Sequence, residues 1–123
     1  MSLVIEFAAP GKLLSMNDRM HWRPKARLTA DWVAASRLAG QEWRRRTRWT
    51  PAPCTVQLIV PVRDRRRRDP HNYFATVKPV VDGLVLAGVW PDDTPEWVST
   101  IEPALAVAAS LVAVVLEVRE GGR

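Results

Sequence analysis

Cysteine is nearly missing from this chain of 123 residues, because Cys54 is the only one. A single thiol can form neither an intramolecular disulfide nor a thiolate metal cage, so the fold has no such staple. The sequence also lacks a run of about 18 apolar residues, and it has no charged leader followed by an apolar stretch. We therefore expect a cytoplasmic protein with no membrane partner.

Lysine is scarce too, since only three of the 18 basic residues are lysine and the others are arginine. The net charge is +5 and the sequence pI is about 10.3. Arginine suits phosphate recognition better than lysine does, because its planar fork can bind two oxygens at once. A GC-rich genome would favour the same composition, so the positions of the arginines are more informative than their number.

The first half of the chain predicts a strand, a loop and a helix. Residues 3–7 are apolar and β-branched or aromatic, and Pro10-Gly11 ends this strand. Residues 12–24 show no period and predict an ordered surface loop, a kind of segment that is often functional. Apolar residues then recur every three or four positions, which predicts an amphipathic helix over residues 24–46.

The second half begins with an apolar strand at residues 55–62. Asp69-Pro70 is a helix start, because Asp caps free backbone N–H groups and Pro is tolerated in the first turn. This helix should reach Gly88, with Pro79 kinking it or splitting it into two pieces.

Two more strands are expected at residues 97–101 and 110–120, joined around Pro103. The last is too apolar on both faces for a sheet edge and should be central, while residues 104–109 could also form a helix. This order predicts an α+β fold with a small mixed β-sheet and two main helices packed on it. With 47% hydrophobic residues, we expect a single domain over residues 1–123.

Basic side chains and possible metal ligands lie close together in one part of the sequence. Four consecutive arginines begin it, and the polar residues that follow are Asp69, His71, Asn72, Lys78, Asp82, Asp92 and Asp93. Arginines can neutralise phosphates, and carboxylates can hold a divalent cation against a phosphodiester. This combination predicts a nuclease, provided that the fold brings Asp69 near Asp92 and Asp93.

Each acid also has a purely local interpretation. Asp69 can simply cap a helix. Asp92 and Asp93 lie between two prolines and can form an ordinary turn. Lys78 and Asp82 are four residues apart on one helical face, which is the spacing of a surface ion pair. Taken one at a time, none of them indicates a function.

The order and spacing of these residues resemble the RusA family of Holliday junction resolvases. The motifs are Arg-Arg-Arg-Arg-Asp-x-His-Asn at residues 65–72, Lys-Pro-x-x-Asp-Gly-Leu at 78–84 and Ala-Gly-Val-Trp-x-Asp-Asp at 87–93. The loop that contains Ser15 and Asn17 resembles the N-terminal Pro-x-Ser-x-Asn segment of the family. Beyond Trp97 the similarity is limited to length and strand pattern.

The resemblance implies a RusA-like fold and a structure-specific endonuclease of DNA recombination and repair. It implies a homodimer that binds a four-way DNA junction and cuts two strands symmetrically by hydrolysis, with Mg²⁺ or Mn²⁺ as cofactor. Such a dimer suits a junction, because a two-fold assembly presents two equivalent sites to two equivalent strands.

The residue roles that the resemblance implies fall into two sets. The catalytic residues would be Asp69, Lys78 and Asp93; the metal ligands would be Asp69, His71, Asp82, Asp92 and Asp93. His71 departs from the family, which usually has a second aspartate there, and imidazole shifts the preference toward Mn²⁺. The spacing from Asn72 to Lys78 is about three residues longer than the family pattern, close to one helical turn.

DNA-binding candidates are the clustered arginines and two amides: Arg44, Arg45, Arg46, Arg65, Arg66, Arg67, Arg68, Asn17 and Asn72. Such residues position the DNA backbone without determining sequence preference. The first arginine cluster could instead complement a helix C-terminus, and both could form a solvated basic face. Among six tryptophans, we expect Trp32 and Trp43 in the core or a dimer interface, and base stacking from loop residues Trp22, Trp49 and Trp90.

A second function class remains open, because His71 removes one acid from the site. It is a catalytically weak or silent protein that binds branched DNA through its basic face. A basic RNA-binding module has less support, since it leaves Asp92 and Asp93 unexplained.

Overall fold

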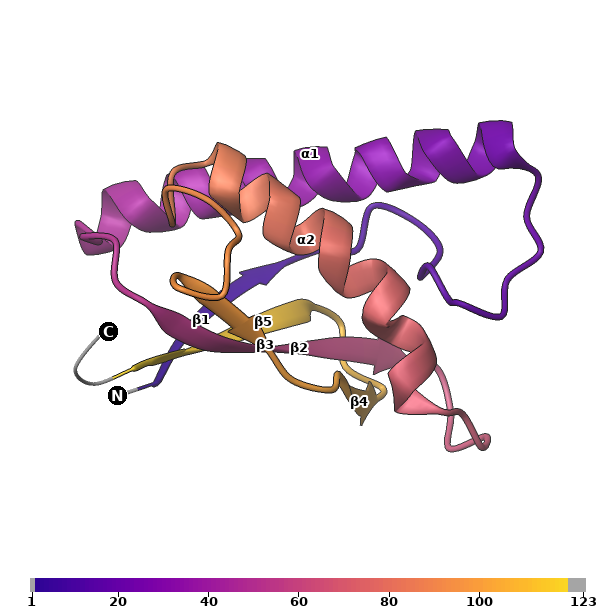
Figure 1. Ribbon diagram of the computed structural model, residues 1–123. Helices are drawn as coiled ribbons and strands as arrows, with labels where there is room; N and C mark the ends of the chain where they lie inside the picture. The colour runs from indigo at the N-terminus through magenta and orange to yellow at the C-terminus, as the bar shows by residue number, and fades with distance from the viewer. Residues whose placement is uncertain (1, 120–123) are drawn as a thin grey trace.

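Two helices lie on one face of a mixed five-stranded sheet in this computed structural model, which describes residues 2–119 (Figure 1). In chain order the elements are β1 (Ser2–Phe7), α1 (Trp22–Thr47), β2 (Cys54–Val62), the 3₁₀ helix η1 (Pro70–Tyr73), α2 (Phe74–Leu86), β3 (Val98–Thr100), β4 (Ala104–Val107) and β5 (Val112–Val118). The predicted α+β fold with two helices packed on a small mixed sheet is confirmed.

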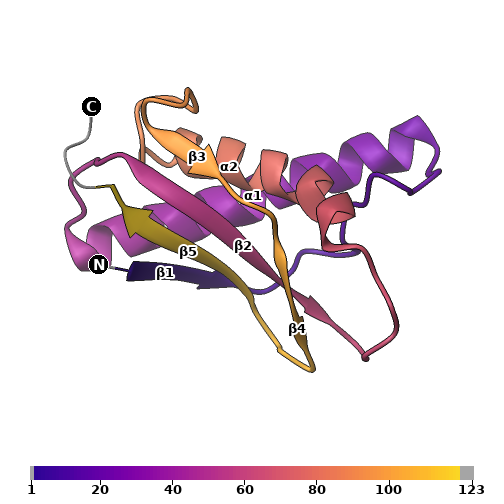
Figure 2. The ribbon, with the colours of Figure 1, turned by 60° about the horizontal axis from the view of Figure 1, so that its bottom comes forward.

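The sheet has the order β1-β5-β2-β3, and β4 also pairs with β2. β5 is antiparallel to both of its neighbours, whereas β3 and β4 run parallel to β2. The central position predicted for the last strand is therefore confirmed. Alternate residues of β2 and β5 are buried, and they form the core beneath the helices. Figure 2 shows the other face of the sheet, which carries no helix.

Helix α1 confirms the predicted helix over residues 24–46 and extends it slightly at both ends. His21 caps its N-terminus, and Pro24 lies in its first turn. The buried side chains of Trp32 and Trp43 lie on its apolar stripe, as predicted. The helix ends at Thr47, and the next residue, Arg48, has a φ of 56° in the left-handed region that stops helices.

The second helical segment differs from its prediction at Pro79. Asp69 caps it, and the break lies between η1 and α2, whereas Pro79 is inside the continuous helix α2. Pro79 lies just past the first turn of α2 and is buried, so its packing offsets the single helical hydrogen bond that it removes. The predicted split at Pro79 is wrong, and the helix ends at Leu86, just before Gly88.

Helices α1 and α2 approach closely at Gly83. A Cβ atom at this position would collide with the Ser36 hydroxyl and the Val33 carbonyl oxygen. Glycine is therefore required for the two helices to pack at this distance. The contact fixes the position of α2, the helix that carries Lys78 and Asp82.

The C-terminal third contains one strand more than the two expected. Residues 104–109 do not form a helix; Ala104–Val107 is strand β4 and pairs with the second half of β2. The alanine-rich segment has no strong intrinsic preference for helix or strand. It forms a strand because its backbone N–H and C=O groups bond those of β2. None of the helices formed by residues 2–119 is long and apolar enough to cross a membrane.

Candidate functional site

The long loop before α1 is attached to α2 by one buried hydroxyl. Thr76 is fully buried, and its Oγ1 accepts a hydrogen bond from the Leu14 N–H at 3.0 Å. The same hydroxyl donates to the Leu14 carbonyl oxygen at 2.6 Å. Two residues later, the Met16 N–H donates to the Asn72 carbonyl oxygen at 2.9 Å. These three bonds hold the loop beside η1.

The loop and η1 form the walls of a surface cleft of about 270 Å³ that contains Asp69. We call it the Asp69 cleft, and its lining residues are Ser15, Asn17, Arg67, Arg68, Asp69, Asn72 and Tyr73. Asp69 Oδ1 accepts the His71 backbone N–H at 3.0 Å, so the predicted capping role is present. Its second oxygen has no hydrogen-bond partner within residues 2–119 and is available to a ligand.

The four consecutive arginines have different environments. The side chain of Arg68 is only 14% exposed, lies 3.1 Å from the Asp64 carboxylate, and donates to the Asp64 and Arg66 carbonyl oxygens. A hydrogen bond from the Arg66 backbone, followed by the Arg68 guanidinium, lowers the pKa of Asp64. Arg68 therefore braces the turn after β2, whereas Arg65, Arg66 and Arg67 are exposed.

Lys78 joins two acids that are distant in sequence. Its ammonium donates to Asp82 Oδ1 at 2.9 Å and to Asp93 Oδ2 at 3.0 Å. These hydrogen bonds, from Asp82 first and then from Asp93, raise the pKa of Lys78. The predicted surface pair with Asp82 is present, and Asp93 joins it from the loop after α2. Two carboxylates thus share one cation, which leaves a local charge of −1.

The five predicted metal ligands do not gather at one point in this arrangement. Asp82 and Asp93 are brought together, but with Lys78 between them. Asp69 lies in its own cleft, and the His71 ring packs edge-on against Phe74 at 5.1 Å between ring centres.

Asp92 stabilises a turn, as its position between two prolines also allowed. It accepts the Thr94 backbone N–H at 2.9 Å, and hydrogen bonds from the side chain and backbone of Thr94 lower its pKa. Within residues 2–119, no group of three or more His, Cys, Asp or Glu side chains is placed to hold a metal ion.

The arginines at the end of α1 are far from the Asp69 cleft. One cluster precedes the nine-residue strand β2 and the other follows it, so they lie about 25 Å or more apart. Arg44 Nη1 donates to the Ala87 carbonyl oxygen at 3.1 Å, which ties α1 to the end of α2. Arg46 is exposed and lies 3.9 Å from Glu42, and Arg45 is also exposed. The clusters therefore do not form one continuous basic patch.

Two of the three tryptophans expected to stack on bases have structural roles. Trp90 is 1% exposed and donates its indole N–H to the Ala52 carbonyl oxygen. Trp49 donates to the Val89 carbonyl oxygen and packs on Trp43, with 5.1 Å between the ring centres. The prediction that Trp90 stacks on bases is therefore wrong, because its ring lies in the core. Trp22 is 66% exposed at the start of α1, beneath the Arg23 guanidinium, and can reach a ligand.

Sequence reasoning missed the residues that build the cleft. Thr76 is a polar residue on the buried side of a mostly apolar helix, and that position was the available signal. Lys12 and Asp18 form a 2.6 Å ion pair inside the loop, and the Lys12 hydrogen bond lowers the pKa of Asp18. Nothing in the local sequence of Tyr73 indicated that it would line the cleft.

No protein-family model matches the chain, and no curated protein sequence has significant similarity to it. The resemblance to the RusA family therefore rests on the motifs within residues 65–93 and on the loop with Ser15 and Asn17.

Replacing Thr76 with valine should loosen the cleft, because valine has nearly the same shape but leaves the Leu14 N–H and C=O buried without partners. We expect the free energy of unfolding to fall by about 2–4 kcal/mol, measured by urea denaturation followed by circular dichroism. Thr47→Val is the matched control; it removes a hydrogen bond from an exposed threonine to the Trp43 carbonyl oxygen and should cost about 1 kcal/mol or less. Equal losses in both variants would contradict the anchoring role.

Lys78 should titrate above the ordinary lysine pKa, because the two carboxylates favour its charged form. In ¹³C NMR titrations, Asp82→Asn and Asp93→Asn should each lower the pKa of Lys78, and the double variant should lower it further. Only three lysines are present, which simplifies assignment. Asp92→Asn is the control, since Asp92 bonds Thr94 instead, and it should leave the Lys78 titration unchanged. An unchanged titration in Asp93→Asn would mean that the bridge does not form in solution.

Proposed function

We propose that this protein binds four-way DNA junctions and cuts them by phosphodiester hydrolysis, as a homodimeric, RusA-like endonuclease of DNA recombination and repair. Mg²⁺ is the proposed cofactor, with Mn²⁺ as a substitute. The observation that carries the proposal is the Asp69 cleft, where Asp69, with one carboxylate oxygen not used in its cap, shares the lining with Arg67, Asn17 and Asn72. Carboxylate, cation and amide together are groups that phosphodiester chemistry uses.

The proposed reaction assigns a separate role to the arginines, to Asp69 and to Lys78. Arg67 lines the cleft, and it can neutralise backbone phosphates together with the neighbouring exposed Arg65 and Arg66. The outward oxygen of Asp69 can accept a proton from an attacking water. Lys78 is held in its charged form by its acidic neighbours and does not line the Asp69 cleft, so its proposed role in stabilising the leaving oxygen requires the scissile phosphate to lie between the cleft and Lys78.

The described arrangement does not fit a metal ion held by three or more side chains, because Lys78 occupies the space between Asp82 and Asp93. That observation favours a second candidate function, a catalytically weak or silent protein that binds branched DNA. Such a protein would use the same exposed arginines and the same cleft. The two candidates therefore share a binding surface and differ only in turnover.

Asp69→Asn should strongly slow junction cutting while leaving junction binding intact, because it keeps the shape of the side chain but removes its basic oxygen. With synthetic four-way junctions and Mg²⁺ or Mn²⁺, we expect the cleavage rate to fall by about 100-fold or more. The matched control is Asp31→Asn, an exposed acid on α1 that should cut like the wild type. If the wild type cuts no faster than Asp69→Asn with either metal, yet binds junctions in a chelator, the silent binder is the correct function.

Arg67→Ala should weaken junction binding through the loss of one phosphate contact. The slope of log K against log salt concentration should become shallower by about 0.9, as measured by fluorescence anisotropy at several salt concentrations. Arg45→Ala is the matched control, because Arg45 is exposed at the opposite end of β2 and should leave the slope nearly unchanged. Equal effects would show instead that the DNA reaches both ends of the molecule.

A further inference from the structure

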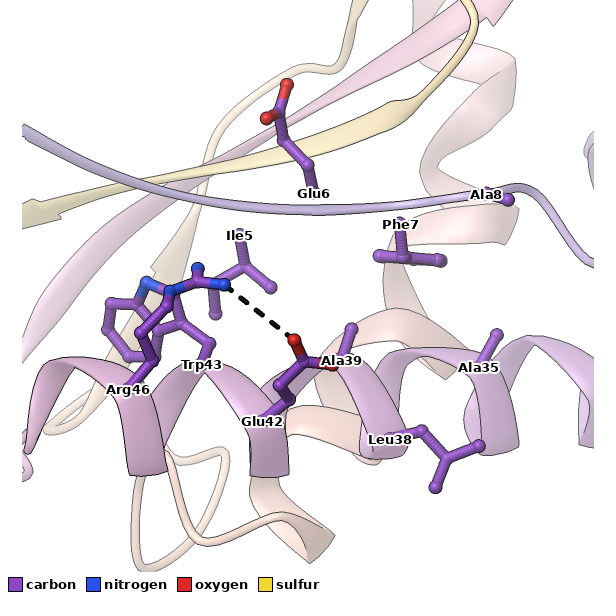
Figure 3. A pocket seen from close by; sticks show the side chains of 10 residues that line it. All are labelled: Ile5, Glu6, Phe7, Ala8, Ala35, Leu38, Ala39, Glu42, Trp43 and Arg46. Atoms are coloured by element: carbon purple, nitrogen blue, oxygen red, sulfur yellow. Dashed lines mark ion pairs between the residues drawn. The ribbon is translucent and has the colours of Figure 1, made fainter.

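A groove between β1 and α1 opens along an unpaired edge of the sheet (Figure 3). It has a volume of about 340 Å³, and Ile5 and Phe7 of β1 point into it toward the helix. Glu6 points to the opposite face of the sheet. Beyond β1, no strand formed by residues 2–119 pairs with its outer side. The backbone N–H and C=O groups on that side are therefore available to another strand.

The two edges of the sheet are built differently. At the far edge, β3 and β4 have three and four residues and are separated by a stretch that contains Pro103. Short strands and proline are the devices by which proteins prevent edge-to-edge pairing. β1 has six residues, contains neither lysine nor proline, and pairs with β5 in an unbroken register without a bulge. β1 is therefore the longer and more regular edge strand, and Glu6 is its one charged residue.

An exposed leucine lies beside this edge, on the helix that packs against β1. Leu38 of α1 is 67% exposed, the highest value among the large apolar side chains of the described residues. Glu42 and Arg46 follow it along the groove, 74% and 65% exposed and only loosely paired at 3.9 Å. The surface next to the edge thus carries an apolar anchor and one charge of each sign.

We propose that β1 pairs antiparallel with β1 of a second copy of this chain. Antiparallel pairing of a strand with itself is two-fold symmetric, so one operation satisfies both free edges. The axis is perpendicular to the sheet, and both pairs of helices then lie on the same face of one ten-stranded sheet, twice the five strands of one copy.

The same operation also gives the exposed leucine a partner. It places α1 of one copy beside α1 of the other, in antiparallel orientation, because α1 is the helix that contacts β1. Leu38 then faces the α1 helix of the partner, which covers its exposed side chain. The interface gives the homodimer of the proposed function its contact surface, but it is argued from the sheet edge and does not require nuclease activity.

Light scattering after size exclusion, over a dilution series without DNA or metal, tests the interface. A chain of 13.8 kDa should elute as a species of twice that mass and dissociate on dilution. Leu38→Asp should raise the dimer dissociation constant by about tenfold or more, because it places a charge where the two α1 helices meet. Leu86→Asp is the matched control, since Leu86 is 57% exposed on α2, away from the groove, and should leave the mass unchanged.

Hydrogen exchange locates the contact independently. The backbone amides of β1 that point away from β5 should be protected in the wild type and lose protection in Leu38→Asp, while the amides bonded between β1 and β5 keep it. Val4→Lys is a second variant, because a lysine on an edge strand opposes pairing, and it too should favour the monomer. Circular dichroism verifies that each variant is folded.

A wild-type protein that is monomeric at every concentration would overturn the proposal, as would a Leu38→Asp dimer as tight as the wild type. A dimer that cuts no junction would overturn the nuclease function and leave this interface in place. A monomer that cuts junctions would do the reverse.

Discussion

The Thr76 hydroxyl is the interaction on which the candidate site depends. It both donates to and accepts from the Leu14 backbone, deep in the structure, and so replaces the water that this segment would otherwise need. The next residue, Ser15, and Asn17 two positions further on reach the Asp69 cleft because Thr76 holds Leu14 and the Asn72 carbonyl oxygen holds Met16. One buried polar side chain thus determines where an irregular loop meets the helix that carries Lys78.

The arginines show how little net charge alone says about binding. Arg44 and Arg68 use their guanidinium groups on carbonyl oxygens of the chain itself, and their role is to hold α1 against α2 and to brace the turn after β2. Arg65, Arg66 and Arg67 lie within the same run but remain exposed. Exposure and existing partners, and not position in a cluster, decide which arginines are free to neutralise a phosphate.

The acids follow the same rule at a smaller scale. Asp69 and Asp92 each use an oxygen to cap a local turn, as their sequence context allows. Asp93 is next to Asp92 in sequence, yet it turns to Lys78, which is 15 residues away. The loop after α2 returns along the helix and so adds a second carboxylate to a helical ion pair. The electrostatic field around Lys78 therefore depends on whether its ammonium keeps both Asp82 and Asp93 as partners.

Periodicity and capping signals in the sequence by themselves determined α1, β2, the central β5 and the start at Asp69-Pro70, because these depend on neighbours a few residues apart. They also sufficed for the α+β class with a mixed sheet. Strand β4, the continuity of α2 through Pro79 and the burial of Trp90 were decided by packing and by pairing with β2. Only the tertiary structure decided which polar groups meet, since Leu14 and Thr76 are 62 residues apart in the chain and no local pattern encodes that contact.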